Sequence, residues 1–126
     1  MKLPIFIYTA TWLLLLCDAP AVAQTRLFTA PQRGGEAIYK SICQDCHMPD
    51  GRGAVGAGTY PALAGNRKLE NAGYPISVII HGLKGMPALG ESFTDQQIAD
   101  VVNYVRTHFG NNYKGRVTLE DVKAAR

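Results

Sequence analysis

The feature of this sequence that most constrains its fold is the run Cys43-Gln44-Asp45-Cys46-His47. Cys-x-x-Cys-His is the attachment pattern of covalent haem. On a helical turn, residues i, i+3 and i+4 lie on one face, so both sulfur atoms and the imidazole point the same way. Each thiol can then form a thioether with a haem vinyl group while His47 reaches the iron from the same side. The pattern predicts a chain that folds around one covalently attached haem c and its iron.

Two other uses of these cysteines are weaker interpretations. A thioredoxin-like redox pair would need a strand before the motif, and here a helical pattern precedes it. A structural zinc site would need two further ligands. The third cysteine of the chain, Cys17, lies in an N-terminal segment that we expect to be removed.

Residues 1–23 have the composition of an export signal. A lysine at the second position precedes the almost wholly apolar run 3–17, and Ala21-Val22-Ala23 supplies a cleavage pattern before Gln24. The run is about 15 residues long, shorter than the roughly 20 that span a bilayer core. We therefore expect export to the periplasm, with a retained membrane anchor as the alternative. A lipoprotein signal ending at Cys17 is less favoured because leucines precede that cysteine.

The remaining segment, residues 24–126, has the length of a single domain. The whole sequence carries 13 Lys and Arg against 10 Asp and Glu, a net charge of +3 without a basic cluster, so nucleic-acid binding is not indicated. Hydrophobic residues make up 47% of the chain, which is typical of a globular protein. A chain this short buries a modest core, so a structural cofactor would stabilise it considerably.

Helical periodicity and capping residues predict an all-α fold. Four helices are expected. The first spans residues 34–46, the second begins at Pro75 and stops at Gly82, and the third begins at Thr94 and closes at Gly110. The fourth begins after a cap at Thr118. The third is the best specified, because Thr94 and Gln97 make a capping box and Phe93 can pack on Ile98 as a hydrophobic staple. Five glycines lie in the loop 48–66, which we therefore expect to contain no strand.

The haem iron of an electron carrier commonly takes a second axial ligand, and methionine opposite histidine raises the reduction potential. Met48 adjoins His47 on the proximal side and cannot reach the opposite face. Met86 lies 39 residues after His47 in Gly-Met-Pro, far enough to pass around the ring, and is the favoured ligand. His81 and His108 are the alternatives, although both stand near helix ends, where the helix dipole favours histidine without any ligand role.

Three further residues indicate a family. Gly35 and Tyr39 stand eight and four residues before Cys43, and Tyr104 lies in the last long helix. With these features the chain resembles the small mono-haem class I cytochromes c, especially those found beside bacterial periplasmic dehydrogenases. The resemblance implies four to five short helices wrapped around one covalent haem, with the first and last main helices crossing at Gly35.

The resemblance also assigns roles to the loops. Residues 60–66 look like the family's proline loop, in which the Pro61 carbonyl accepts a hydrogen bond from the second nitrogen of His47. Residues 85–90 are similar to its methionine-ligand loop. Met48 departs from the family, which usually has glycine after the histidine, and this leaves the local turn in question. Residues 106–118 resemble a C-terminal extension of dehydrogenase-linked members.

The function implied is electron carriage rather than catalysis, with a periplasmic dehydrogenase as donor and an oxidase or another cytochrome as acceptor. Contact with a membrane would come only through an uncleaved signal or a membrane-bound partner. A permanent cytochrome subunit of a dehydrogenase is the alternative, and an open-site peroxidase or gas sensor would require Met86 to be detached. The expected apolar shell is Ile38, Leu63, Ile79, Leu83, Leu89, Val101 and Val105, and the expected cations at the exposed haem edge are Arg52, Arg67, Lys68 and Lys84.

Overall fold

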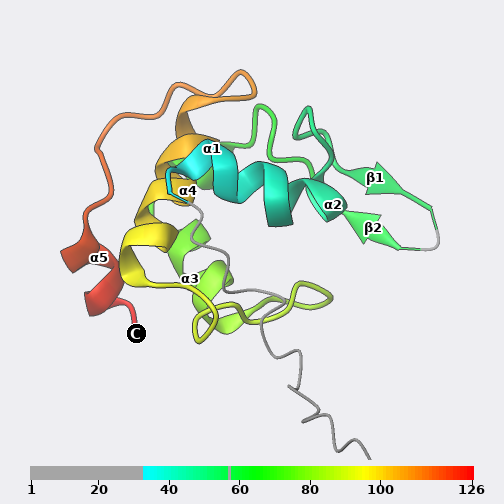
Figure 1. The fold of residues 1–126 in the computed structure, drawn as a ribbon. Helices are drawn as coiled ribbons and strands as arrows, with labels where there is room; N and C mark the ends of the chain where they lie inside the picture. The colour runs from blue at the N-terminus through cyan, green and yellow to red at the C-terminus, as the bar shows by residue number, and fades with distance from the viewer. Residues whose placement is uncertain (1–32, 57) are drawn as a thin grey trace, which may run out of the picture.

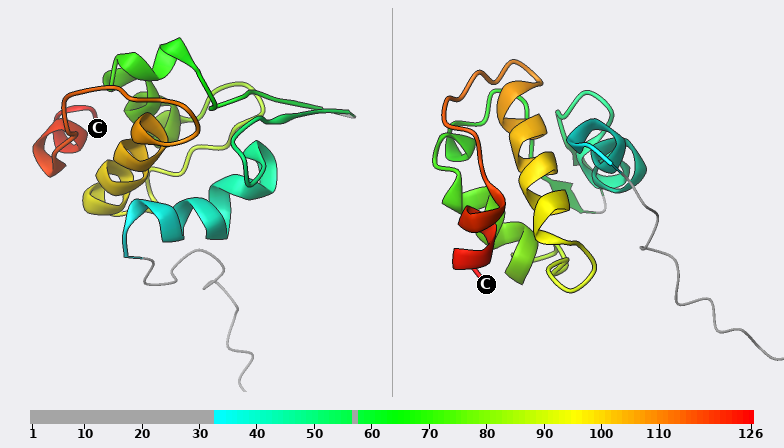
Figure 2. Two further views of the ribbon diagram at one scale, coloured as in Figure 1. Left: turned by 90° about the horizontal axis from the view of Figure 1, so that it is seen from above. Right: turned by 60° about the vertical axis from the view of Figure 1, so that its left-hand side comes forward.

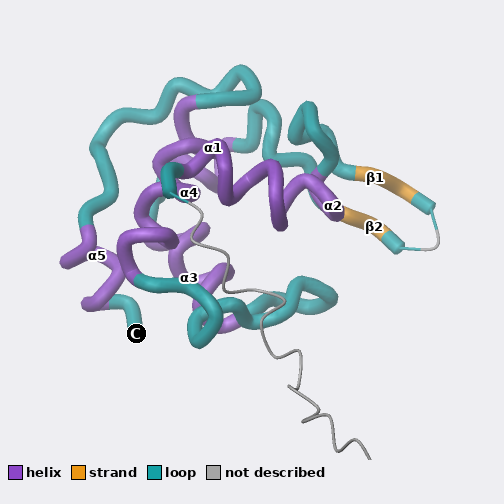
Figure 3. Tube along the Cα trace, in the orientation of Figure 1, coloured by secondary structure: helices purple, strands orange, loops and turns teal. Residues whose placement is uncertain are grey.

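The fold is described for residues 33–56 and 58–126 in a computed structural model. The predicted export signal, residues 1–23, lies outside this part. Helices joined by long loops make up nearly all of the described chain, as Figure 3 shows. Within it, no helix combines the length and the apolar composition that crossing a membrane requires.

The order of elements confirms the expected all-α class (Figure 1). The chain forms α1 (Gly35–Ile38), the π-helical segment η1 (Tyr39–Cys43), α2 (Gln44–His47), β1 (Ala54–Val55), β2 (Thr59–Tyr60), the 3-10 helix η2 (Arg67–Glu70), α3 (Gly73–His81), α4 (Asp95–Thr107) and α5 (Leu119–Ala124). Helix α4 is central, with α1, α3 and α5 packed against it.

The first predicted helix, 34–46, forms as a continuous helical run from Gly35 to His47 whose middle turn is π-helical. There the Gln44 N–H donates to the carbonyl oxygen of Tyr39, five residues back. Sequence periodicity does not reveal such a wider turn, because the same side chains suit an α-helix. Widened turns of this kind often adjoin functional sites.

The prediction that loop 48–66 contains no strand is wrong. Ala54 pairs with Tyr60 and Val55 with Thr59 in a two-residue antiparallel ladder. Such a short hairpin needs only two pairs of residues, and flanking glycines do not prevent it. The left view of Figure 2 agrees with Figure 1 in placing this hairpin at the edge of the molecule, beyond α2.

The other helix boundaries are close to those expected. Helix α3 begins at Gly73, two residues before Pro75, and ends at His81, where Gly82 with a φ of 74° follows it. Helix α4 has the expected Thr94–Gln97 capping box but ends at Thr107, short of Gly110. The capping box of α5, from Thr118 to Asp121, also forms.

The helix crossing predicted at Gly35 is confirmed. A Cβ atom at this position would lie 2.1 Å from the Asp100 carbonyl oxygen and 2.6 Å from the Tyr104 Cβ atom. The Tyr39 and Tyr104 rings pack beside the crossing with centroids 5.6 Å apart. Around α4 the core gathers buried apolar residues from α1, α3, α4 and α5, among them Ile38, Ile76, Ile98, Val102 and Val122. The predicted staple residue Phe93 is buried in the same core.

Candidate haem site

The Cys43–His47 turn presents three groups of different exposure. Cys43 is half-buried, Cys46 is exposed and His47 is buried. Both cysteines are free thiols. The pKa of the Cys43 thiol is raised to about 12, chiefly because the thiol is buried and to a smaller extent by electrostatic interaction with the neighbouring Cys46 and Asp45. The turn therefore carries two thiols that are not joined to each other, next to a histidine whose orientation is fixed.

The orientation of His47 comes from the proline loop. Its Nδ1 atom lies 2.9 Å from the carbonyl oxygen of Pro61. A carbonyl oxygen can only accept, so Nδ1 carries the proton and donates. In the neutral ring this leaves Nε2 with a free electron pair, the state in which imidazole binds a metal. The contact is the one that the resemblance implied.

Three segments hold the Pro61 carbonyl in place. The backbone packs so closely at Gly53 that a Cβ atom there would lie 2.1 Å from the Tyr60 carbonyl oxygen. The Gly51 carbonyl accepts from the Leu63 N–H at 2.7 Å. The Asn111 side-chain amide donates to the carbonyl oxygens of Leu63 and Val105, both at 2.8 Å, and so ties the loop to α4.

Met48 adopts a backbone conformation that explains the glycine usual in the family. Its φ is 65° and its ψ 156°, a region that glycine occupies almost alone. Two hydrogen bonds hold its carbonyl oxygen, from the Tyr39 hydroxyl at 2.7 Å and from the Gly51 N–H at 3.1 Å. Burial raises the pKa of Tyr39 to about 12, so this hydroxyl keeps its proton. The turn after His47 is thus formed, with Met48 in a strained backbone conformation.

Met86 lies in a loop that is closed by backbone hydrogen bonds. Leu83 and Met86 exchange two N–H to carbonyl bonds of 3.0 Å each. At the far end, the Leu89 N–H donates to the Ile79 carbonyl oxygen of α3 at 2.8 Å. Figure 1 and the left view of Figure 2 show this loop extending from α3 and α4 on the side where α2 lies. The Met86 side chain is half-buried.

The two rival histidines are exposed and make other contacts. His81 Nε2 lies 3.3 Å from the Ala125 carbonyl oxygen, next to α5. His108 stacks on Tyr104 with ring centroids 4.0 Å apart, and its Nδ1 atom lies 2.9 Å from the Tyr104 carbonyl oxygen. These contacts favour a structural explanation for both histidines.

The residues around the two loops fit a flat apolar cofactor. Tyr60 and Leu83, next to Pro61 and near Met86, are large hydrophobic side chains exposed at 44% and 47%. Of the expected shell, Ile38, Val101 and Val105 are buried and Leu63, Ile79 and Leu89 are partly buried against the core, whereas Leu83 is exposed. Tyr60 and Leu83 lie on the loops that contain Pro61 and Met86, where a bound apolar cofactor would cover them. Within the described ranges, no three His, Cys, Asp or Glu residues are grouped to hold a metal ion by themselves.

The four cations expected at the exposed edge, Arg52, Arg67, Lys68 and Lys84, are all exposed. Arg52 lies 3.6 Å from Asp50, and the Lys68 ammonium lies 5.8 Å from the centre of the Tyr74 ring. All four cations therefore lie at the surface, and Arg52 and Lys68 each have a neighbouring side chain as a partner.

Two residues that support the loops of the site were not predicted from the sequence. Asn111 and Arg106 are polar or charged but buried, and both bind main-chain carbonyls far away in sequence. Periodicity cannot find them, because their partners depend on how the loops fold back. A partial signal existed for Arg106, which lies four residues after the buried Val102 and therefore on a packed face of α4.

Comparison with known proteins identifies the family. The family model described as cytochrome c oxidase, cbb3-type, subunit III matches residues 30–105. Cytochrome c6 of Aphanizomenon flos-aquae is 31% identical over 81 residues, which cover 64% of this chain and 93% of that protein.

Longer relatives are subunits of dehydrogenases. The cytochrome c subunit of the quinone alcohol dehydrogenase of Gluconacetobacter polyoxogenes is 39% identical over 105 residues. The fructose dehydrogenase cytochrome subunit of Gluconobacter japonicus is 36% identical over 107 residues. Each match covers 73% of this chain but 22% of the relative, so the chain spans about a fifth of their length. By the family match and the cytochrome c6 match, the chain belongs to the cytochrome c family of electron-transfer proteins, which carry covalently bound haem c.

Proposed function

We propose that residues 24–126 form a one-electron carrier domain in which Cys43 and Cys46 attach the haem and His47 and Met86 bind its iron from opposite faces. The observation that carries the assignment is the 2.9 Å contact between His47 Nδ1 and the Pro61 carbonyl oxygen. This hydrogen bond orients the His47 ring beside the two thiols and leaves its Nε2 atom available to bind a metal.

When bound, haem c supplies an iron that alternates between the ferric and ferrous states. The chain's own residues keep the surroundings constant during that change. The Pro61 carbonyl holds the His47 ring, and the two hydrogen bonds between Leu83 and Met86 hold the methionine loop. Apolar side chains such as Leu63 and Leu89 exclude water, which disfavours the extra charge of ferric iron and raises the potential.

The relatives support a dehydrogenase as the electron donor, since several are cytochrome subunits of alcohol, fructose and gluconate dehydrogenases. An oxidase or another cytochrome is the proposed acceptor. Export through residues 1–23 would place the protein in the periplasm. The same relatives favour a second form of this function, in which the chain stays bound to a dehydrogenase as its cytochrome subunit. Co-elution with a larger dehydrogenase subunit in size-exclusion chromatography of the native extract distinguishes that form from a free carrier.

The exposed cations Arg52, Arg67, Lys68 and Lys84 would surround the haem edge and steer it toward an acidic partner. Steering of this kind weakens as ionic strength rises. Electron transfer from the donor should therefore slow at high salt.

The ligand assignment is tested by Met86→Ala, with Met48→Leu as the matched control. Met86→Ala should lower the reduction potential, abolish the absorption feature of a methionine–Fe(III) bond, and open the iron to cyanide. Met48→Leu should change none of these. A Met86→Ala protein with an unchanged spectrum and potential would remove Met86 from its role, and an oxidised parent without the absorption feature would favour the open-site peroxidase or sensor.

The attachment site is tested by Cys46→Ala. This variant keeps one thioether at most, so acidic acetone should extract more of its haem than from the parent protein. Equal haem retention in the two proteins would contradict the assignment.

A further inference from the structure

The segment 112–117, called here the strap, joins the end of α4 to α5 and is held unusually firmly for a surface loop. The Asn103 side chain forms two hydrogen bonds with Val117, donating to its carbonyl oxygen at 2.9 Å and accepting from its N–H at 2.8 Å. The Tyr113 N–H donates to the Arg106 carbonyl oxygen at 3.0 Å. Both ends of the strap are thus fixed to α4.

Arg106 fixes the middle of the strap from below. Its guanidinium donates to the carbonyl oxygens of Lys114, at 2.7 Å, and Gly115 in the strap, and to those of Leu69, at 2.9 Å, and Glu70, at 3.2 Å, in η2. Arg106 is 3% exposed, and its partners here are carbonyl oxygens rather than a carboxylate. A buried guanidinium held in this way leaves its positive charge uncompensated.

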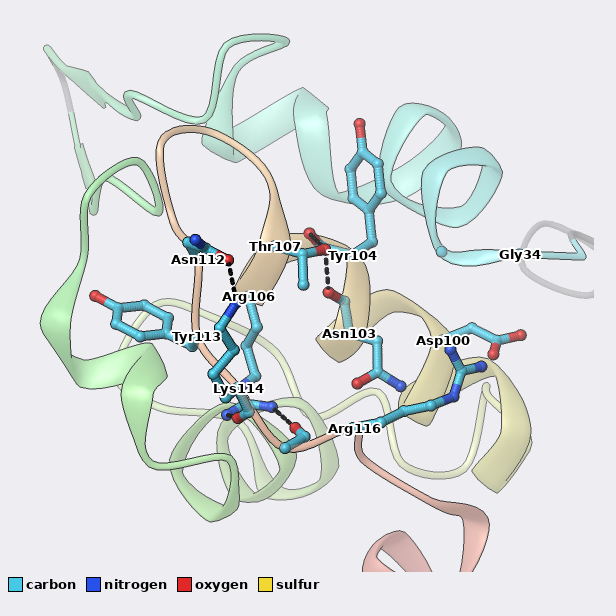
Figure 4. A pocket seen from close by; sticks show the side chains of 12 residues that line it. Gly34, Asp100, Asn103, Tyr104, Arg106, Thr107, Asn112, Tyr113, Lys114 and Arg116 are labelled. Atoms are coloured by element: carbon cyan, nitrogen blue, oxygen red, sulfur yellow. Dashed lines mark hydrogen bonds between the residues drawn. The ribbon is translucent and has the colours of Figure 1, made fainter.

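A surface groove of about 540 Å³ runs between the strap and the α1–α4 crossing, as Figure 4 shows. Its lining includes three cations, Arg106, Lys114 and Arg116, and one carboxylate, that of Asp100. In the described part of the chain, none of the three cations forms an ion pair. The neighbouring groove on the other side of the strap is lined by the same three cations together with two carboxylates, Glu70 and Asp121, so the positive excess is larger on the Asp100 side.

The groove is remote from the haem site. Figures 1 and 2 place the strap on the opposite side of α4 from α2 and the β1–β2 hairpin. Lys114 and Arg116 are exposed, and the Lys114 ammonium is oriented by a 3.0 Å hydrogen bond to the Asn112 side chain. Because the strap backbone is already held by hydrogen bonds, a partner that binds these charges orders little additional backbone.

We propose that this groove is a docking surface for an acidic segment of a partner protein. Carboxylates of the partner would pair with Lys114 and Arg116 and would lie in the positive potential of the buried Arg106. The partner held there would leave the haem edge free to exchange electrons. Docking at the strap requires no change of haem oxidation state, so it goes beyond the proposed electron transfer.

The test measures binding of a fluorescein-labelled oligoglutamate peptide to the haem-loaded protein by fluorescence anisotropy at low salt. The test variant is Lys114→Glu with Arg116→Glu, and the matched control is Lys40→Glu with Lys123→Glu, which changes the net charge equally at two exposed lysines that line neither groove. We expect the strap variant to bind roughly tenfold more weakly than the parent, and the control to change affinity less than about twofold. A variant with Lys114→Arg and Arg116→Lys should bind like the parent.

Three results would overturn the proposal: no binding to the parent, equal weakening in both charge-reversed variants, or greater weakening in the control. All four substituted positions are exposed, and unchanged circular dichroism and haem absorption verify that each variant folds. Reduction of each variant by a chemical reductant is measured separately. A docking failure can therefore be told apart from a failure of electron transfer.

Discussion

Replacing Gly35 by alanine tests the helix crossing that supports the haem site. The added Cβ atom would lie 2.1 Å from the Asp100 carbonyl oxygen, whereas ordinary contacts begin near 3.4 Å. Helices α1 and α4 would have to separate by about 1.3 Å at this point. Because the obstacle is a main-chain oxygen, no side-chain rotation can relieve the clash.

The cost can be estimated from two opposing effects. Overpacking a well-packed core costs about 1–3 kcal/mol and occasionally more, and a main-chain obstacle places Gly35→Ala at the upper end. Alanine gains up to about 1 kcal/mol over glycine in a helix. We therefore expect the free energy of unfolding to fall by about 2 kcal/mol, mostly through repulsion at Asp100 and Tyr104.

The assay is guanidinium unfolding of the haem-loaded protein, followed by circular dichroism. The control is Gly58→Ala, because nothing lies within 4 Å of a Cβ atom there and its φ is not positive. Such a change should leave stability unchanged or raise it by about 0.4–1 kcal/mol. If Gly35→Ala is as stable as the control, the crossing is looser than the structure shows and the reasoning fails.

Three further changes have defined outcomes. Met48→Gly should raise stability by about 1 kcal/mol in thermal unfolding, because about 1–3 kcal/mol of backbone strain exceeds the roughly 0.5–1 kcal/mol that glycine costs; a loss would show that Met48 is unstrained. Arg106→Leu should cost about 3 kcal/mol and expose the strap to limited proteolysis, since several carbonyl oxygens lose a charged donor; unchanged cleavage would contradict this. Hydrogen bonds from the Thr118 N–H and hydroxyl hold the pKa of Asp121 below its usual value, so its stabilisation should be present above about pH 4 and be lost as the pH falls; Asp121→Asn should flatten this acid dependence of the unfolding free energy.

The features that sequence predicts here are those specified within a few residues. The Cys43–His47 run and the two capping boxes at Thr94 and Thr118 each encode a local geometry, and the structure forms both boxes. Gly35 was predictable as a crossing point because its spacing from Cys43 matches the family. The ligand roles of His47 and Met86 remain predictions.

The features that sequence did not predict either involve residues whose local preferences suit more than one conformation or depend on contacts with distant segments. The π-helical turn within Tyr39–Cys43 and the hairpin at Ala54–Tyr60 involve residues whose local preferences also suit an ordinary helix and a loop. A charged residue such as Arg106 is expected at the surface whatever its spacing, and only the return of the strap and η2 over its side chain supplies the carbonyl partners that allow its burial. The surroundings of such a residue depend on how segments far away in the sequence fold against it.

The hydrogen bonds also explain how a small domain can carry an electron with little rearrangement. The histidine turn, the proline loop and the methionine loop are each tied to neighbouring backbone: Gly53 N–H to the His47 carbonyl oxygen at 3.1 Å, Leu63 N–H to that of Gly51, and Leu89 N–H to that of Ile79. None of these bonds includes a group that changes charge when iron changes oxidation state. We therefore expect the main-chain frame to stay in place when the iron changes state, and the segments that carry the proposed ligands should transfer electrons faster when rigid than when mobile.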